Sequence, residues 1–460
     1  MTLRTLALVC CLVLAGCTAP TPGYGETPTE TTTPVPSGLP DDPDSDRLGW
    51  ENGYWYNESI AINQSDGLNE SELTAFVART MARVEIIRGA EFEQTVPVEV
   101  ISRAEYRNQS GRRDTTVDSP RERGREQLWE APLLVGEQRT VPGAFGELYG
   151  GSVLGYYSPS QDRIVIVAGG DDLRVDRVTL AHELVHALQD QRFSLLPGGR
   201  SHDAGLARTG VVEGDASYVE QLYEQRCSGN WSCVPRPDRT SGAGIADRNL
   251  GAYLAIYAPY SDGPSFVHQV RQRGGWEAVN QLYEQPPRST EQLLHPERYP
   301  EDGPETVRVT DRSGERWERY GIADTVGEST LYAMFWFQQG VNRSTLRDED
   351  VPYSRYNYVS QPSEGWAGDR LVPYRNGDAN GYVWKLRWES RADAREFATS
   401  YESLLVEQLN ATEVREGVYR VPDDSTFGDA FRVTRDGRTV TIVNAPRVAA
   451  LENVHAAESD

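Results

Sequence analysis

The segment TLAHELVHALQDQRF, residues 179–193, places two of the six histidines of this 460-residue chain four positions apart. At about 100° per residue, its leucine, valine and alanine side chains share one broad apolar face. The segment contains no proline or glycine, and Asp171 and Asp172 precede it. These features predict a helix with one side packed on a core. His182, Glu183 and His186 fall on the other side.

Two interpretations fit this polar side. Histidines at positions i and i+4 stand one above the other on a helix, so that both imidazoles can bind one ion. A glutamate between them can reach a water molecule bound to that ion. The alternative is an ordinary solvated face. Because histidine is scarce in this chain and the other polar faces carry Arg, Glu and Asp, the metal interpretation is favoured.

A zinc ion held by two histidines needs a third protein ligand. The segment GLARTGVVEGDASYVEQLYEQRC, residues 205–227, also predicts a helix, and Glu213 lies within its small, apolar part. A buried carboxylate requires a partner because unpaired burial is costly, and a metal ion would serve. The alternative is an exposed glutamate on a helix edge.

The order His-Glu-x-x-His and then Glu on the next helix resembles the gluzincin branch of zinc metallopeptidases. The strings AHELVHALQDQRF, VVEGDA and PPRSTEQLLHPERY are similar to a largely uncharacterised set of zincin-like proteins that includes haloarchaeal surface lipoproteins. The resemblance spans roughly residues 155–299. It implies His182, His186 and Glu213 as zinc ligands and Glu183 as the general base.

The chain departs from this family at one position. Gluzincins carry an aspartate four residues after the ligand glutamate, where it orients a ligand histidine. This chain has Ser217 there. Asp215 is expected to face elsewhere, and Asp190 lies one turn beyond His186, so the sequence leaves the orienting group open.

The expected chemistry is metal-assisted hydrolysis of a peptide bond. Zinc activates a water molecule, and Glu183 accepts its proton and passes it to the leaving amine. A further donor should stabilise the oxyanion. His295, in the proline-bounded string LLHPERY, is the first candidate, with a structural role as the alternative; Tyr257 and Tyr260 are the second.

The first residues, MTLRTLALVCCLVLAGC, combine one arginine, a short apolar run and the ending Leu-Ala-Gly-Cys. An apolar run of this length predicts a secretory signal rather than a membrane span. The ending resembles a lipobox, which implies a signal peptide over residues 1–16 and lipidation of Cys17. Residues 17–47, rich in Thr, Pro and acidic residues, predict an extended tether. We therefore expect a lipid-anchored protein on the extracellular face of the membrane; a plain secretory signal is the alternative.

Composition is consistent with life outside the cell in concentrated salt. The formal charge is −23, and Lys385 is the single lysine among 46 basic residues. This balance resembles haloarchaeal proteins, whose surface charge is screened by salt; an acidic secreted protein of a mesophile is the alternative. No basic stripe favours nucleic-acid binding. Glycosylation sequons begin at Asn57, Asn63, Asn69, Asn108, Asn230, Asn342 and Asn410.

Cys227 and Cys233 remain once the signal and the anchor are set aside. They enclose only five residues, and in an oxidising compartment such a pair predicts a disulfide. As a metal site the pair is weak, since no third ligand lies near in the sequence.

The predicted fold class is α+β. A helix over residues 71–88, a strand from residue 96 and a hairpin within residues 153–169 precede the histidine helix, as expected for a zincin, in which a sheet edge can pair with an extended peptide. Two helices should follow, PSFVHQVRQRG and WEAVNQLYEQ, and then an irregular segment. We place a zincin-like domain at residues 48–300 and a C-terminal α+β domain or lobe at 301–460.

Two functions follow from these observations. The favoured one is a zinc-dependent peptidase that cleaves peptide or protein substrates at the cell surface. The alternative is a surface or adhesion protein that keeps a zincin scaffold without turnover, which the missing aspartate supports.

Overall fold

The computed structural model describes residues 43, 45–110, 119–149, 153–168, 172–195, 198–237, 249–347 and 351–457. The predicted signal peptide, Cys17 and most of the predicted tether lie outside these residues. The chain mixes helices and strands, in agreement with the predicted α+β class. It divides into two compact units. The first comprises Met1–Arg112, Tyr149–Leu195 and Val219–Gly244, and the second comprises Arg113–Leu148, Leu196–Tyr218 and Ile245–Asp460.

The first unit holds a three-stranded sheet and the helices beside it. The strand order is β3–β5–β4, with β3 parallel and β4 antiparallel to the central β5. Asn69 caps the helix that precedes the sheet by accepting a hydrogen bond from the amide of Glu72. The elements are α1 (Glu70–Arg88), β3 (Val98–Ser102), α2 (Arg103–Ser110), β4 (Gly155–Ser158), β5 (Arg163–Ala168) and the short pair β1 (Trp50–Glu51) and β2 (Tyr54–Trp55).

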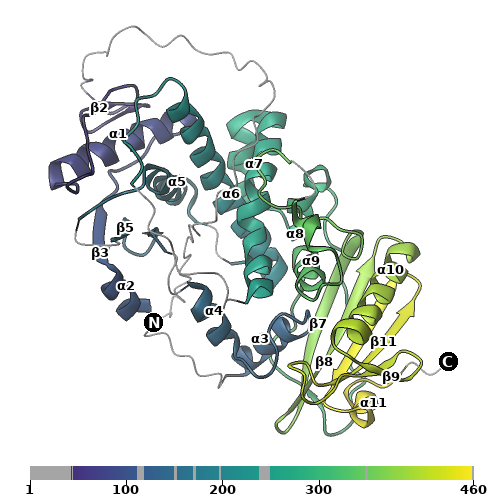
Figure 1. Cartoon of the computed structure of the whole chain (residues 1–460). Coiled ribbons are helices and arrows are strands. Elements are labelled where there is room, and N and C mark those ends of the chain that lie inside the picture. The colour runs from purple at the N-terminus through teal and green to yellow at the C-terminus, as the bar shows by residue number, and fades with distance from the viewer. Residues whose placement is uncertain are drawn as a thin grey trace, which may run out of the picture. The chain divides into compact units, whose positions relative to one another are not determined.

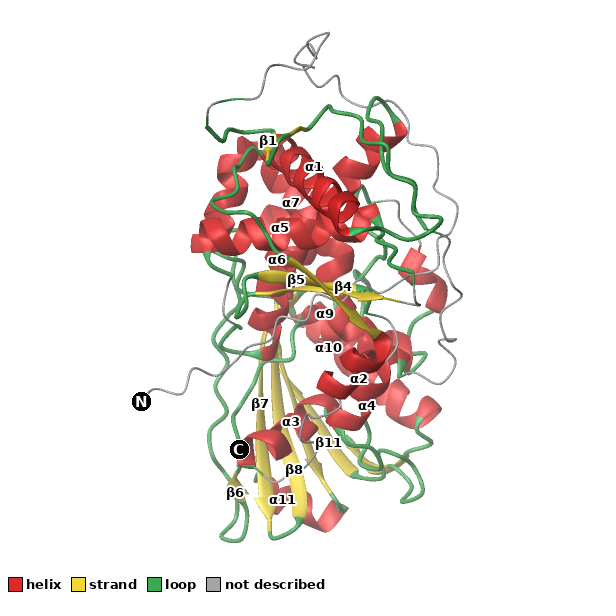
Figure 2. Ribbon diagram, turned by 90° about the vertical axis from the view of Figure 1, so that its left-hand side faces the viewer, coloured by secondary structure: helices red, strands yellow, loops and turns green. Residues whose placement is uncertain are grey.

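Helix α5, Arg177–Phe193, is the predicted histidine helix, and it packs against β4 and β5 (Figure 2). It begins at Asp176, whose carboxylate accepts hydrogen bonds from the amides of Val178 and Thr179. Its apolar face is buried as expected. Its polar side is buried too: His182 is 2% exposed and Glu183 is 0% exposed. A solvated polar face is therefore excluded, and the buried polar groups need partners.

Helix α6, His202–Ser228, is one continuous helix of 27 residues. Its residues up to Tyr218 belong to the second unit and those from Val219 to the first. The helix ends at the predicted disulfide, which is confirmed: Cys227 and Cys233 are bonded at an S–S distance of 1.98 Å.

The helical part of the second unit differs from the prediction around residue 250. The segment α7 runs from Leu250 to Glu284 and contains both predicted helices, the first of which begins at residue 250 and not at residue 264. It contains Pro259 and Pro264, residues that are unfavourable inside a helix. The predicted break is real, because Gly274 and Gly275 have non-helical backbone angles. Other helices here are α3 (Pro120–Glu130), α4 (Val141–Tyr149), α8 (Thr290–Leu294) and α9 (Glu328–Phe337).

The second unit also contains a seven-stranded antiparallel sheet of order β6–β7–β8–β12–β11–β10–β9 (Figure 1). Side chains alternate between its faces. Trp384 and Trp388 of β8 meet Phe397 of α10 on one face, while Val383 joins a cluster with Leu451 of α11. The bounds are β6 (Glu318–Arg319), β7 (Trp366–Asn376), β8 (Ala379–Trp388), α10 (Arg391–Ser403), β9 (Thr412–Arg415), β10 (Val418–Arg420), β11 (Ala430–Asp436), β12 (Thr439–Ala445) and α11 (Leu451–Val454).

Candidate metal centre

The two histidines of α5 direct their imidazole rings at each other. The Nε2 atoms of His182 and His186 lie 3.0 Å apart, and both side chains are almost fully buried. A tetrahedral zinc ion bound at 2.0–2.1 Å would hold two nitrogen atoms about 3.3 Å apart. The spacing of the pair is therefore close to that of two ligands of one ion.

The opposite ring nitrogen of each histidine is held by an oxygen atom. Nδ1 of His182 lies 2.9 Å from Oε2 of Glu220, and Nδ1 of His186 lies 2.9 Å from Oε1 of Gln189. An ionised carboxylate and an amide oxygen only accept hydrogen bonds, so both Nδ1 atoms carry the proton. The Nε2 lone pairs then point toward each other, an arrangement that a shared cation stabilises.

Glu213 of α6 supplies the third predicted ligand. It lies seven residues before Glu220 on the continuous helix α6, so it stands on the same helix face as the glutamate that binds His182. Glu213 is fully buried, and Tyr260 donates a hydrogen bond of 3.1 Å to its Oε1 atom. Two imidazoles and one carboxylate form a donor set that suits zinc and leaves a fourth position for water. The residues present therefore fit the predicted ion.

A close helix crossing places Tyr260 beside Glu213. A Cβ atom on Gly214 would lie 2.5 Å from the carbonyl carbon of Gly263, and one on Gly263 would lie 2.5 Å from the carbonyl oxygen of Gly210. Only glycines let α6 and α7 approach this closely. The glycines flanking Glu213, which appeared as a small-residue stretch in the sequence, are thus part of what builds the centre.

Glu183, the predicted general base, is fixed by the sheet. The amide N–H of Tyr157, in the edge strand β4, donates a hydrogen bond of 2.9 Å to Oε2 of Glu183. The side chain of Tyr157 donates a second bond, of 3.0 Å, to Asp190. Asp190 therefore binds Tyr157 of strand β4 and not a histidine. It is not the group that orients the ligand histidines.

The group that orients His182 is Glu220, which was not among the residues predicted from the sequence. Glu220 lies seven residues after Glu213, and 3.6 residues per turn keep both on the same face of α6. Ser217 stands at the four-residue spacing of gluzincins. Among the residues that the structure describes, it makes no hydrogen bond to either histidine. Asp215 faces elsewhere as expected, because it accepts a hydrogen bond from Tyr283. The signal that could have revealed Glu220 is this seven-residue spacing.

His295, the first candidate for the oxyanion donor, does not belong to the metal-binding group. Its Nε2 atom lies 3.1 Å from Oε1 of Glu328, and its Nδ1 atom lies 4.0 Å from Glu297. A hydrogen bond from His295 to a substrate would therefore come from Nδ1. The role of His295 as the oxyanion donor stays a prediction. Of the second candidates, Tyr260 binds Glu213, whereas Tyr257 stacks on Tyr260 at a centroid distance of 5.8 Å.

The buried pair of His295 and Glu328 predicts a loss of stability at alkaline pH. Burial opposes a charge on His295, but the hydrogen bond and the charge of Glu328 outweigh it and raise the pKa of His295 to about 9. The pKa in the unfolded chain is about 6.5. The pair's contribution is thus complete below pH 6.5 and is lost as the pH rises through 9. Denaturant unfolding at a series of pH values should show this fall.

The control for this prediction is His295→Gln, which can still donate a hydrogen bond to Glu328 but cannot titrate. We expect its free energy of unfolding to fall less than that of the natural protein between pH 6.5 and 9. Equal slopes for the two proteins would contradict the assignment.

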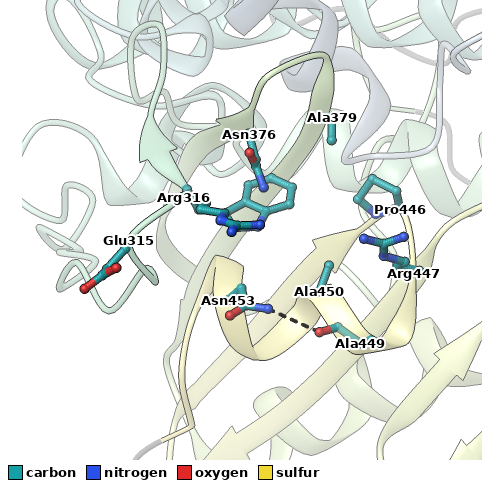
Figure 3. Close-up of a pocket in the computed structure, with 10 residues that line it drawn as sticks. Glu315, Arg316, Asn376, Ala379, Pro446, Arg447, Ala449, Ala450 and Asn453 are labelled. Carbon is teal, nitrogen blue, oxygen red and sulfur yellow. Dashed lines mark hydrogen bonds between the residues drawn. The ribbon is translucent and has the colours of Figure 1, made fainter.

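The second unit contains a hollow of about 860 Å³ that involves none of the predicted site residues. Figure 3 shows the side chains around it. The lining residues are Glu315, Arg316, Trp317, Asn376, Ala379, Pro446, Arg447, Ala449, Ala450 and Asn453.

Comparison with known proteins places only the C-terminal part of the chain. Residues 318–455 match a family described as a domain of unknown function, DUF8575. The matched range contains β6 to β12 but none of the residues of the candidate metal centre. No curated protein and no solved structure matches the chain. Among the described residues, no helix is long and apolar enough to cross a membrane.

Proposed function

We propose that this protein is a zinc-dependent peptidase in which His182, His186 and Glu213 hold the metal and Glu183 is the general base. The observation that carries the proposal is the pair of imidazoles whose Nε2 atoms lie 3.0 Å apart, with Glu213 on the same face of α6 as Glu220, which binds His182. These atoms are buried, and each histidine is held in one tautomer by Glu220 or Gln189.

The metal would supply a polarised water molecule at neutral pH and a Lewis acid for the scissile carbonyl. Glu183 follows His182 directly on α5 and is held through one oxygen by Tyr157. A carboxylate in this position can accept the proton of the attacking water and return it to the leaving amine. Glu220, Gln189 and Tyr260 position the ligands and take no part in proton transfer.

The proposed substrate is an extended peptide. Strand β4 is the edge of its sheet, and an edge strand can pair with an extended chain through main-chain hydrogen bonds. The contact between Tyr157 and Glu183 links this edge directly to the general base. A peptide paired with β4 would therefore lie beside Glu183.

We further propose that the protein works on the outside of the cell in concentrated salt, held to the membrane through lipid on Cys17. The sequence pattern of residues 1–17 and the formal charge of −23 support this location. The Cys227–Cys233 disulfide is consistent with it, because disulfides persist in oxidising compartments.

The test is to measure zinc and hydrolysis on the same sample. We expect one zinc per chain in the purified protein and cleavage of a mixed peptide pool in molar salt. A strong chelator should abolish both, and added zinc should restore both. Zinc that binds stoichiometrically without any cleavage would favour the alternative, a non-catalytic surface or adhesion protein.

A further inference from the structure

A second group of potential ligands lies entirely within the second unit. Oxygen atoms of Glu130, Glu137 and Asp429 all lie within 4.8 Å of one another. Glu130 is the last residue of α3, Glu137 lies in the loop that follows, and Asp429 directly precedes β11. None of the three belongs to the candidate zinc group, so a role in zinc binding does not account for this cluster of carboxylates.

The backbone holds the two loops together at this point. The amide of Glu137 donates a hydrogen bond of 3.1 Å to the carbonyl oxygen of Thr426. A Cβ atom on Gly136 would lie 2.5 Å from the same oxygen, so no larger residue fits without a shift. The approach of three carboxylates is therefore built into the packing of these loops.

The charges of the cluster oppose one another. Burial and the neighbouring carboxylates of Asp429 and Glu137 raise the pKa of Glu130 well above its usual range. Burial raises the pKa of Asp429 to about 6, although Asn444 and Arg420 act in the opposite direction. Glu130 also lies at the C-terminal end of a helix, where the helix dipole disfavours a negative charge.

Asn444 brings a further buried polar side chain to this cluster. The side chain lies on the central strand β12, is 1% exposed, and donates a hydrogen bond of 2.9 Å from Nδ2 to Oδ2 of Asp429. Its amide oxygen Oδ1 is buried and accepts no hydrogen bond from any residue that the structure describes. A buried amide oxygen without a donor is costly, whereas a cation beside it would remove that cost.

We propose that Glu130, Glu137, Asp429 and Asn444 form a calcium site that fastens the loop after α3 to the seven-stranded sheet. Carboxylate and amide oxygens are the ligands that calcium prefers. Two oxygens on opposite sides of a calcium ion lie about 4.6–5.2 Å apart, so carboxylate oxygens within 4.8 Å of one another fit inside one coordination sphere. Water would complete the 6–8 ligands.

The test uses the full chain, stripped of divalent ions and then reloaded with zinc, in molar NaCl, which screens diffuse attraction to the acidic surface. Calorimetric titration with CaCl2 should show one ion per chain, and calcium should raise the melting temperature. Glu137→Gln and Asp429→Asn should each weaken calcium binding at least about tenfold, because calcium affinity depends on the number of charged ligands. Their zinc content should not change.

Glu137→Gln is the decisive variant, because Glu137 is exposed and its loss should not disturb folding. The matched control is Asp424→Asn, an exposed aspartate in the loop before Asp429 that lies outside the cluster. This control should bind calcium like the natural protein. Absence of a calcium titration, undiminished binding by Glu137→Gln and Asp429→Asn, or equal binding of magnesium would each overturn the assignment.

Discussion

Glu183→Gln should bind zinc as the natural protein does and hydrolyse peptides about 10²–10⁴-fold more slowly, which is the usual span for loss of a positioned acid–base group. The substituted side chain keeps its length, and its amide oxygen can still accept the hydrogen bond from the amide of Tyr157. It cannot accept a proton from water. Steady-state hydrolysis of a mixed peptide pool in molar salt, with zinc measured on the same samples, tests this expectation.

The comparison is informative because the two proteins differ only in one buried group. Equal activity would show that another residue or a contaminating peptidase cleaves the substrate. Loss of zinc together with activity would show that Glu183 has a structural role in the metal centre, which would contradict its assignment as a base. Inactivity of both proteins with zinc bound would favour the non-catalytic surface protein.

Glu220→Ala should weaken zinc binding about 10–100-fold, the usual effect of removing a partner that orients a ligand histidine. Glu220 holds Nδ1 of His182 at 2.9 Å, and its carboxylate fixes the tautomer that would present Nε2 to the proposed zinc ion. The Glu220 side chain is 23% exposed and His182 is 2% exposed, so the substitution should also lower the melting temperature of the metal-free protein, because a buried N–H loses its acceptor. Competition with a chromophoric chelator measures the affinity.

Ser217→Ala is the matched control, because Ser217 stands where gluzincins carry the orienting aspartate. We expect its zinc affinity to equal that of the natural protein. The double variant Glu220→Ala with Ser217→Asp returns a carboxylate to the gluzincin position and should recover part of the affinity. A large effect of Ser217→Ala, with none of Glu220→Ala, would reverse the roles assigned to the two positions.

The sequence correctly predicts those elements around the candidate metal centre that depend on neighbouring residues in the chain. The apolar face of α5, the β4–β5 hairpin and the Cys227–Cys233 disulfide depend on residues close together in the chain, and the structure confirms each of them. Helix α7 was only partly predicted, because Pro259 and Pro264 normally end or kink a helix. In the structure this helix packs against α9 and approaches α6 closely at Gly263.

The contacts that complete the centre could not be predicted from local pattern. Tyr260 reaches Glu213 across 47 residues, and Tyr157 reaches Glu183 across 26. Such contacts depend on which elements pack together, and a single sequence does not encode that packing in any short motif. The cluster of Glu130, Glu137 and Asp429 is the extreme case, since Asp429 follows the two glutamates by almost 300 residues.

The continuity of α6 sets a rule for insertions and deletions. Glu213 and Glu220 share one face of α6 only while seven residues separate them on one unbroken helix, and on that face Glu220 binds His182. A single inserted residue would rotate one of them by about 100° relative to the other and remove it from the centre. A chain that shares this arrangement should therefore keep the length between the two glutamates and a glycine at the position of Gly214. Searching for His-Glu-x-x-His followed by two glutamates in this fixed phase would find such chains even where the four-residue aspartate is missing.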